Sequence, residues 1–132
     1  MTELLGLSIK ELKEELQQQG EKSYRGEQIM QWLSRGVSFE KMKNLPLKLR
    51  QLLRERYREG YAHILRREEA ADGTQKYLLA FADGETVETV FMQKRYGNTV
   101  CVSTQVGCRM GCAFCASCAD GLVRNLTAGE IL

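Results

Sequence analysis

The chain has 132 residues, of which 43% are hydrophobic and 27% are charged, and its formal net charge is +2. This length suits one ordinary domain with a modest core, and the composition excludes an intrinsically disordered chain. The net charge is too small to support a global electrostatic argument for nucleic-acid binding. No apolar run approaches the ~20 residues of a membrane span. The first residues do not begin a signal peptide, so we expect a cytoplasmic protein that does not engage a membrane.

The first 60 residues predict a bundle of three helices. Ser8 and Glu11 have the spacing of a capping box, which predicts the start of a helix. Apolar residues at helical spacing follow them, and Gly20 is expected to end this helix. Ser23 is the expected N-cap of the second helix. The expected ranges of the second and third helices are about 24–34 and about 46–59.

The exposed side of the third predicted helix is basic. The only acidic residues on this side are Glu55 and Glu59. The cations are Lys48, Arg50, Arg54, Arg56 and Arg58. Such a face is either simply solvated or contacts an RNA backbone. Trp32 falls within the apolar stripe of the second helix, so we interpret it as a core residue rather than a base-stacking one.

From about residue 61 the pattern changes to alternating apolar and polar residues. The pairs Asp72-Gly73 and Asp83-Gly84 are strong turn signals between the predicted strands. We therefore expect a four-stranded antiparallel meander. Its strands are expected near residues 63–67, 75–81, 86–92 and 99–103.

The end of the chain predicts the start of a further helix. Thr127 and Glu130 form another capping box, close to the last residue. A strand, a loop and a helix start indicate the first unit of a truncated β/α barrel. The expected fold class is α+β. The expected domains are a helical domain (1–60), an antiparallel β segment (61–96) and the start of a barrel-type core (97–132).

All five cysteines lie between residues 101 and 118, which is not the pattern of a secreted disulfide framework. Cys108, Cys112 and Cys115 have the spacing C-x₃-C-x₂-C. Three thiolates on one short loop can each bind one iron of a [4Fe-4S] cluster and leave the fourth iron open. A zinc loop and unligated thiols are the alternatives, although structural zinc usually takes four ligands in paired spacing.

The cysteine motif and its flanks resemble the RlmN/Cfr family of radical S-adenosylmethionine (SAM) RNA methyltransferases. The resemblance rests on the cysteine spacing with an aromatic residue before the last cysteine, and on three flanking stretches. These stretches are Val87-Glu88-Thr89-Val90, Cys101-Val102-Ser103-Thr104-Gln105-Val106-Gly107-Cys108 and Gly121-Leu122-Val123-Arg124-Asn125-Leu126. The similarity runs over essentially the whole chain, but it covers only the N-terminal part of such an enzyme. We therefore expect a fragment that is inactive alone.

The resemblance implies roles for individual residues. Glu88 would be the proton acceptor, and Cys101 would form a transient disulfide with a methyl-carrying cysteine that this chain lacks. Phe114 would lie beside the SAM bound to the cluster, although packing beneath the loop is an equally good interpretation. Cys118 departs from the family pattern, and we interpret it as incidental rather than as a ligand.

The resemblance also implies the activity and the partners. The intact enzyme would methylate carbon 2 of adenine in 23S rRNA and tRNA, with a [4Fe-4S] cluster and SAM as cofactors. Its N-terminal helical domain would engage the RNA. It would act as a monomer and take electrons from a flavodoxin-like donor. Cfr-like methylation at carbon 8 and a non-enzymatic metal-binding RNA module remain the alternatives.

Overall fold

The computed structural model describes all residues from 1 to 132, and these residues form two compact units. The helical unit contains residues 1–61 with residues 128–130 and 132. The β unit contains residues 62–127 with residue 131. None of the helices combines the length and the apolar character needed to cross a membrane.

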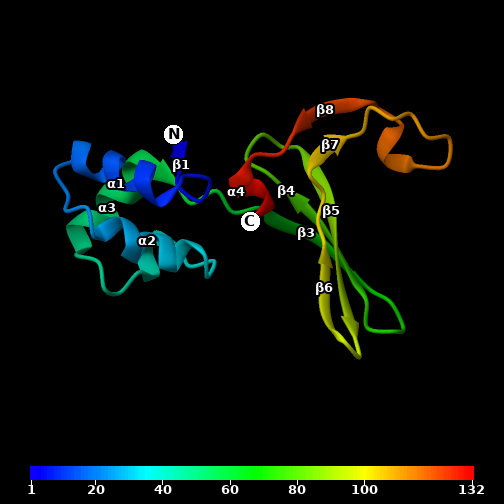
Figure 1. Ribbon diagram of the computed structural model, residues 1–132, viewed down its shortest axis with the longest axis horizontal. Coiled ribbons are helices and arrows are strands. Elements are labelled where there is room, and N and C mark those ends of the chain that lie inside the picture. The colour runs from blue at the N-terminus through cyan, green and yellow to red at the C-terminus, as the bar shows by residue number, and fades with distance from the viewer. The chain divides into compact units, whose positions relative to one another are not determined.

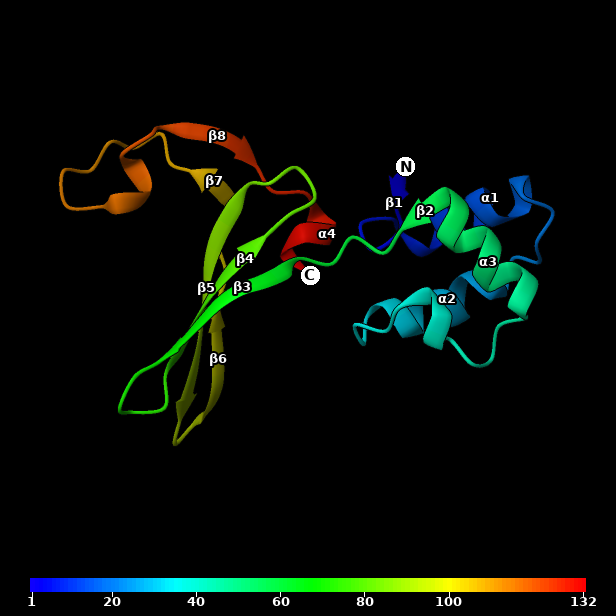
Figure 2. The same cartoon turned by 180° about the vertical axis from the view of Figure 1, so that it is seen from behind.

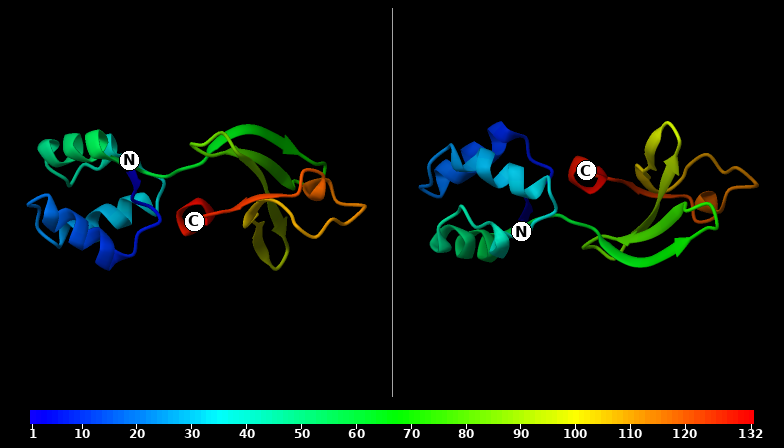
Figure 3. Two further views of the ribbon diagram at one scale, coloured as in Figure 1. Left: turned by 90° about the horizontal axis from the view of Figure 1, so that it is seen from above. Right: turned by 90° about the horizontal axis from the view of Figure 1, so that it is seen from below.

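The helical unit contains three α-helices and a short 3₁₀ turn, which lie close together in every view (Figures 1 and 3). These are α1 (Ile9–Gln18), α2 (Arg25–Leu33), η1 (Phe39–Lys41) and α3 (Leu47–Arg56). Two short parallel strands, β1 (Thr2–Glu3) and β2 (Tyr57–Arg58), join the beginning of the unit to the residues after α3 (Figure 2). The three predicted helices are therefore confirmed.

The predicted capping box of α1 is present. The Ser8 backbone N–H donates to the Glu11 carboxylate over 2.8 Å, and the Glu11 N–H donates to Ser8 Oγ over 3.3 Å. The start of α2 differs from the prediction. Its N-cap is Tyr24 rather than Ser23, and no side chain caps it.

Helix α3 is shorter than predicted, because it ends at Arg56 and the chain then becomes extended. Tyr57 is buried in strand β2, and its hydroxyl donates to Glu15 over 2.8 Å. Burial, together with the hydrogen bond to the Glu15 carboxylate, raises the pKa of Tyr57 to about 12. The pairing with β1 and this buried contact outweigh the helical pattern of the sequence.

The core of the helical unit is made of the apolar stripes predicted from the sequence. Phe39 and Met42, from the segment between α2 and α3, are also buried in it. Trp32 is half-buried at its edge, and its indole N–H donates to the Asn44 side-chain oxygen. The buried members are Leu4, Leu5, Leu12, Leu16, Ile29, Leu33, Phe39, Met42, Leu45, Leu49, Leu53 and Tyr57.

The β unit contains the predicted antiparallel meander, with strand order β3-β4-β5-β6. Its long hairpins are visible in Figures 1 and 3. The strands are β3 (His63–Glu69), β4 (Gln75–Ala80), β5 (Thr86–Lys94) and β6 (Gly97–Cys101). Because β5 and β6 pair with each other, the domain boundary expected at residues 96 and 97 falls inside this sheet.

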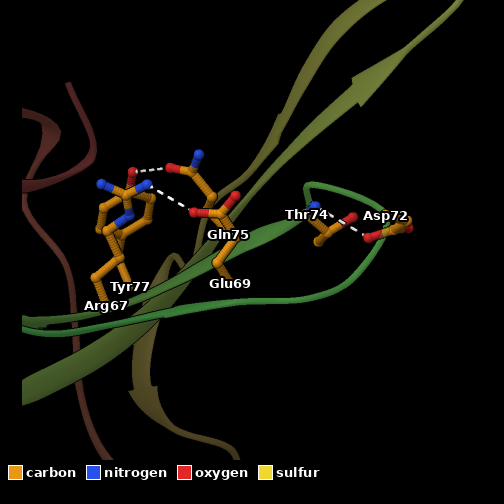
Figure 4. Close-up of polar contacts among 6 residues, drawn as sticks. All are labelled: Arg67, Glu69, Asp72, Thr74, Gln75 and Tyr77. Carbon is orange, nitrogen blue, oxygen red and sulfur yellow. Dashed lines mark hydrogen bonds and ion pairs between the residues drawn. The ribbon is translucent and has the colours of Figure 1, made fainter.

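The turns between the strands follow the predicted Asp-Gly pairs. The Asp72 carboxylate accepts the Thr74 N–H over 3.0 Å, and Gly73 between them has a positive φ of 82° (Figure 4). At the root of this turn Arg67 donates to Glu69 over 2.9 Å. This Asx-type contact with a left-handed glycine is the reason why the Asp-Gly pair specifies the turn.

The end of the chain departs from a simple strand–loop–helix unit. A second small antiparallel pair contains β7 (Gln105–Gly107) and β8 (Leu122–Asn125), and the cysteine loop runs between them with a 3₁₀ turn, η2 (Ala116–Cys118). The loop thus joins two paired strands rather than a strand and a helix. Helix α4 (Ala128–Ile131) begins after the predicted capping residue Thr127.

Leu12→Ala should destabilise the helical unit by about 2–5 kcal/mol, because Leu12 is completely buried and its removal leaves a cavity. Leu47→Ala is the matched control, since the Leu47 side chain is 62% exposed. Urea denaturation followed by far-ultraviolet circular dichroism measures both changes. Equal losses of stability in the two variants would contradict the assigned core.

Candidate metal centre

The cysteine loop is closed at its base by the hairpin of β7 and β8. Val106 pairs with Arg124 and Gly107 with Leu122, and the Cys108 N–H donates to the Gly121 carbonyl over 3.0 Å. These contacts hold residues 107 and 121 together. The loop between them projects beyond the hairpin in all views (Figures 1, 2 and 3).

At the base of the loop, the backbone of Gly107 packs closely against the Gly121 carbonyl group. Its φ is 72°, and a Cβ atom at this position would lie 2.0 Å from the Gly121 carbonyl oxygen. Both the backbone conformation and the lack of space require glycine here. Gly111 has a similar φ of 66° but open space around it.

Within the loop, short backbone hydrogen bonds connect the cysteines in sequence. The Cys115 N–H donates to the Cys112 carbonyl, and the Cys118 N–H donates to the Cys115 carbonyl, each over 3.2 Å. A hollow of about 390 Å³ is lined by residues 111–116 with Cys118 and Ala119. Two of the predicted ligands and Cys118 therefore line one hollow.

The predicted ligands Cys108, Cys112 and Cys115 are free, partly exposed thiols on this one loop. No group of three or more His, Cys, Asp or Glu side chains is gathered closely enough to hold a metal ion. The structure thus brings the three thiols onto one loop without placing them in a ligating arrangement.

The thiols nevertheless influence one another. The backbone N–H of Ser117 and the side chain of Cys118 lower the pKa of Cys115. The Cys112 N–H favours the Cys118 thiolate, but desolvation and the neighbouring thiols of Cys115 and Cys108 outweigh it and raise the pKa of Cys118. The pKa of Cys118 therefore depends on two of the predicted ligands.

Phe114 does not pack beneath the loop. Its side chain is 93% exposed, and it lines the hollow beside Cys112 and Cys115. The interpretation of Phe114 as a packing residue is therefore wrong. Its expected place beside bound SAM stays a prediction.

Glu88 and Cys101 lie on the same face of the meander. Val90 in β5 pairs with Cys101 in β6, and Glu88 precedes Val90 by two strand positions. Directly paired residues share a face, and so do residues two apart on one strand. Cys101 is exposed at the end of its strand.

Glu88 contacts two residues that sequence analysis missed. Its carboxylate lies 3.4 Å from Lys76 Nζ, and its backbone carbonyl accepts the Ser103 hydroxyl over 2.7 Å. The Glu88 side chain is 59% exposed, so it is not enclosed in a pocket. The strand register would have identified Lys76, because it pairs with Val90 on the same face.

Arg124 anchors the strand after the cysteine loop. Its Nε donates to Asp83 over 2.7 Å, and its guanidinium lies 5.6 Å from the Phe81 ring centre. The hydrogen bond from Arg124 and the Glu85 N–H lower the pKa of Asp83. Strand β8 is thereby fixed to the turn between β4 and β5.

The predicted basic face is partly engaged within the helical unit. Arg54 forms an ion pair with Glu40 over 2.7 Å, Arg50 donates to the Glu40 carbonyl, and Arg56 donates to the Gln19 side chain. Arg58 belongs to β2 rather than to the helix. The cations therefore do not form a single free stripe.

Gly107→Ala should destabilise the β unit more than Gly111→Ala. Both variants force alanine into a left-handed conformation, which costs about 1–2 kcal/mol. Only Gly107→Ala adds a collision with a carbonyl oxygen. Thermal unfolding and amide exchange at Cys108 measure the difference, and equal effects would show that the base of the loop is not closed as described.

Comparison with known proteins gives a consistent result. Residues 2–58 match the family model of the ribosomal RNA large subunit methyltransferase N-terminal domain. A "Probable dual-specificity RNA methyltransferase RlmN" of Clostridium beijerinckii is 48% identical over 134 aligned residues, covering 100% of this chain and 38% of the relative. A relative of the same name from Bacillus licheniformis is 49% identical, covering 98% of this chain and 36% of the relative.

A solved structure also matches along almost the whole chain. The crystal structure of a radical SAM methyltransferase from Sphaerobacter thermophilus is 41% identical, with a TM-score of 0.92 over 99% of this chain. The match covers 39% of that structure's chain, so this sequence spans about two-fifths of the proteins it resembles. Residues 2–58 therefore match the N-terminal domain of the ribosomal RNA large subunit methyltransferases, and the whole chain is similar to part of proteins named RlmN and of a radical SAM methyltransferase.

Proposed function

We propose that this chain forms the cluster-binding N-terminal part of an enzyme that methylates carbon 2 of adenine in 23S rRNA and tRNA. The observation that carries the proposal is the loop with C-x₃-C-x₂-C spacing, closed by β7 and β8. It occurs in a chain that aligns over its full length with proteins named RNA methyltransferases.

The donor set fits a [4Fe-4S] cluster. Thiolate is the soft ligand that iron–sulfur clusters take, and Cys108, Cys112 and Cys115 are free of disulfides. When bound, such a cluster supplies the electron that cleaves the sulfonium of SAM. The chain's own contribution is to bind the cluster through these three sulfurs.

Glu88 and Cys101 are the proposed catalytic residues. The Glu88 carboxylate accepts the proton from the adenine carbon that gains the methyl group, which is general base catalysis. Cys101 pairs transiently with a methyl-carrying cysteine outside these 132 residues and so releases the RNA. The shared face of Glu88 and Cys101 supports the proposal, because both side chains then face one substrate.

The proposed partners are the RNA substrates and a flavodoxin-like electron donor. The cations of the helical unit supply attraction to phosphate, with Lys48 and Arg58 extending the basic surface around α3. The reducing cytoplasm, where thiols stay free, is the proposed location. We propose that the enzyme acts as a monomer and that Phe114 lies beside SAM.

Anaerobic reconstitution with iron and sulfide should give the wild-type chain a [4Fe-4S] cluster. Cys108→Ala should abolish its uptake, because two thiolates remain from the motif. Cys101→Ala should leave it unchanged. Iron and sulfide analysis with visible absorption measures the outcome. A wild-type protein that binds zinc but never takes up iron with sulfide would refute the cluster.

In the full-length enzyme that contains this chain, Glu88→Gln should lower adenine methylation by about 10²-fold or more, because the amide cannot accept the proton. Its cluster content should not change. Glu85→Gln, at the neighbouring turn, is the matched control and should keep full activity. Mass spectrometry of the modified nucleoside measures the yield. An 8-methyladenine product would assign the chain to Cfr-like methylation instead.

A further inference from the structure

Lys76 lies between two carboxylates on one face of the meander. Its Nζ atom is 3.4 Å from Glu88 Oε1 and 3.6 Å from Glu68 Oε2. Lys76 belongs to β4, and its two partners belong to β3 and β5, the strands on either side of β4. The two ion pairs therefore restrict where the ammonium group of Lys76 can lie.

The strand register places Lys76 in one row with Cys101. Lys76 pairs with Val90, and Val90 pairs with Cys101 on the next strand. Directly paired residues share a face of a sheet, and so does Glu88, which lies two positions from Val90. Neighbouring strands are about 4.8 Å apart, so the backbones of Lys76 and Cys101 are separated by about 10 Å. Lys76 therefore lies on the face that carries both proposed catalytic residues.

The backbone and the side chain of Glu88 are held by different contacts. The Ser103 hydroxyl donates to the Glu88 carbonyl over 2.7 Å, and Leu78 pairs with Glu88 across β4 and β5. The side chain of Glu88 is 59% exposed, and its ion-pair partner is Lys76. The backbone position is thus set by the sheet and by Ser103, whereas Lys76 limits the rotation of the carboxylate.

We propose that Lys76 is a positioning residue for Glu88, an inference that rests on the proposed function. The ammonium group engages one carboxylate oxygen and leaves the other free to accept the proton from the adenine carbon. That proton passes to Glu88, and Lys76 neither gains nor loses one. A carboxylate that is oriented before the substrate arrives loses less freedom on the way to the transition state, which increases the rate.

In the full-length enzyme that contains this chain, Lys76→Met should lower kcat by about tenfold and leave the KM for RNA unchanged. Lys76→Arg keeps the positive charge and should recover most of the loss. Lys94→Met is the matched control and should keep the wild-type kcat. Lys94 is exposed to a similar extent and forms an ion pair with Asp72 over 3.8 Å, at the far end of β5.

Mass spectrometry of the modified nucleoside over a range of RNA concentrations measures both constants. Iron analysis should show the same cluster content in every variant. A Lys76→Met enzyme with a raised KM and an unchanged kcat would overturn the inference, because that pattern is expected if Lys76 simply contacts an RNA phosphate.

A double-mutant cycle tests whether Lys76 acts through Glu88. In a Glu88→Gln enzyme, Lys76→Met should change kcat by less than about twofold, because the carboxylate that Lys76 orients is already absent. An equal loss of kcat from Lys76→Met in the wild-type and Glu88→Gln backgrounds would show that Lys76 acts independently of Glu88, and the inference would be wrong.

The outcomes separate this inference from the proposed function. If Glu88→Gln impairs methylation at carbon 2 and Lys76→Met does not, the role of Lys76 is overturned and the function stands. If the wild-type enzyme does not methylate carbon 2 of adenine, or if Glu88→Gln keeps full activity, the proposed function itself is overturned.

Discussion

The close approach of Gly107 to the Gly121 carbonyl is the constraint on which the candidate site depends. A Cβ atom at residue 107 would lie 2.0 Å from the Gly121 carbonyl oxygen, so no side-chain carbon fits there. The chain can therefore enter and leave the cysteine loop through one narrow base, closed by the hydrogen bond from Cys108 to Gly121. Four thiols lie on the loop between these points, but they are not gathered in a ligating geometry.

The proposed metal site is consistent with thiols that are not gathered together in the absence of a metal. Bringing thiolates together without a cation would place like charges side by side, which costs free energy. The Ser117 N–H and the Cys118 side chain lower the pKa of Cys115, whereas desolvation and the neighbouring thiols raise the pKa of Cys118, so the Cys115 thiolate is favoured over the Cys118 thiolate. A bound cation removes the repulsion, so closing of the loop and binding of the metal are expected to occur together.

Local patterns in the sequence predicted most of the helices, strands and turns, because these elements are formed by contacts between residues close in sequence. The capping box at Ser8 and the turns at Gly73 and Gly84 each depend on residues close in sequence. The features that the sequence did not predict depend on residues far apart in the chain. Tyr57 is in a strand paired with β1 rather than in the predicted helix, and β7 pairs with β8 although the cysteine loop separates them. Neither partner can be identified from spacing alone.

For the candidate site, the sequence predicted the functional residues but not the residues that surround them. Cysteine spacing and family resemblance predict Cys108, Cys112 and Cys115 as ligands, and the resemblance alone predicts the roles of Glu88 and Cys101. To predict that Lys76 lies near Glu88, one needs the register of β4 against β5. To predict that the Cys118 N–H bonds to the Cys115 carbonyl, one needs the 3₁₀ turn after Cys115. Both depend on how a backbone segment is oriented, which residue types do not encode.

The exposure of Glu88 sets a condition on its proposed chemistry. The Glu88 side chain is 59% exposed and lies 3.4 Å from Lys76 Nζ, so water reaches the carboxylate within these 132 residues. Closed active sites exclude water from the reacting groups. In the proposed enzyme, the surface that covers Glu88 must therefore come from bound RNA or from protein beyond these 132 residues. The same covering would exclude water from Cys101 on the shared face, so substrate binding and activation of both residues would be one event.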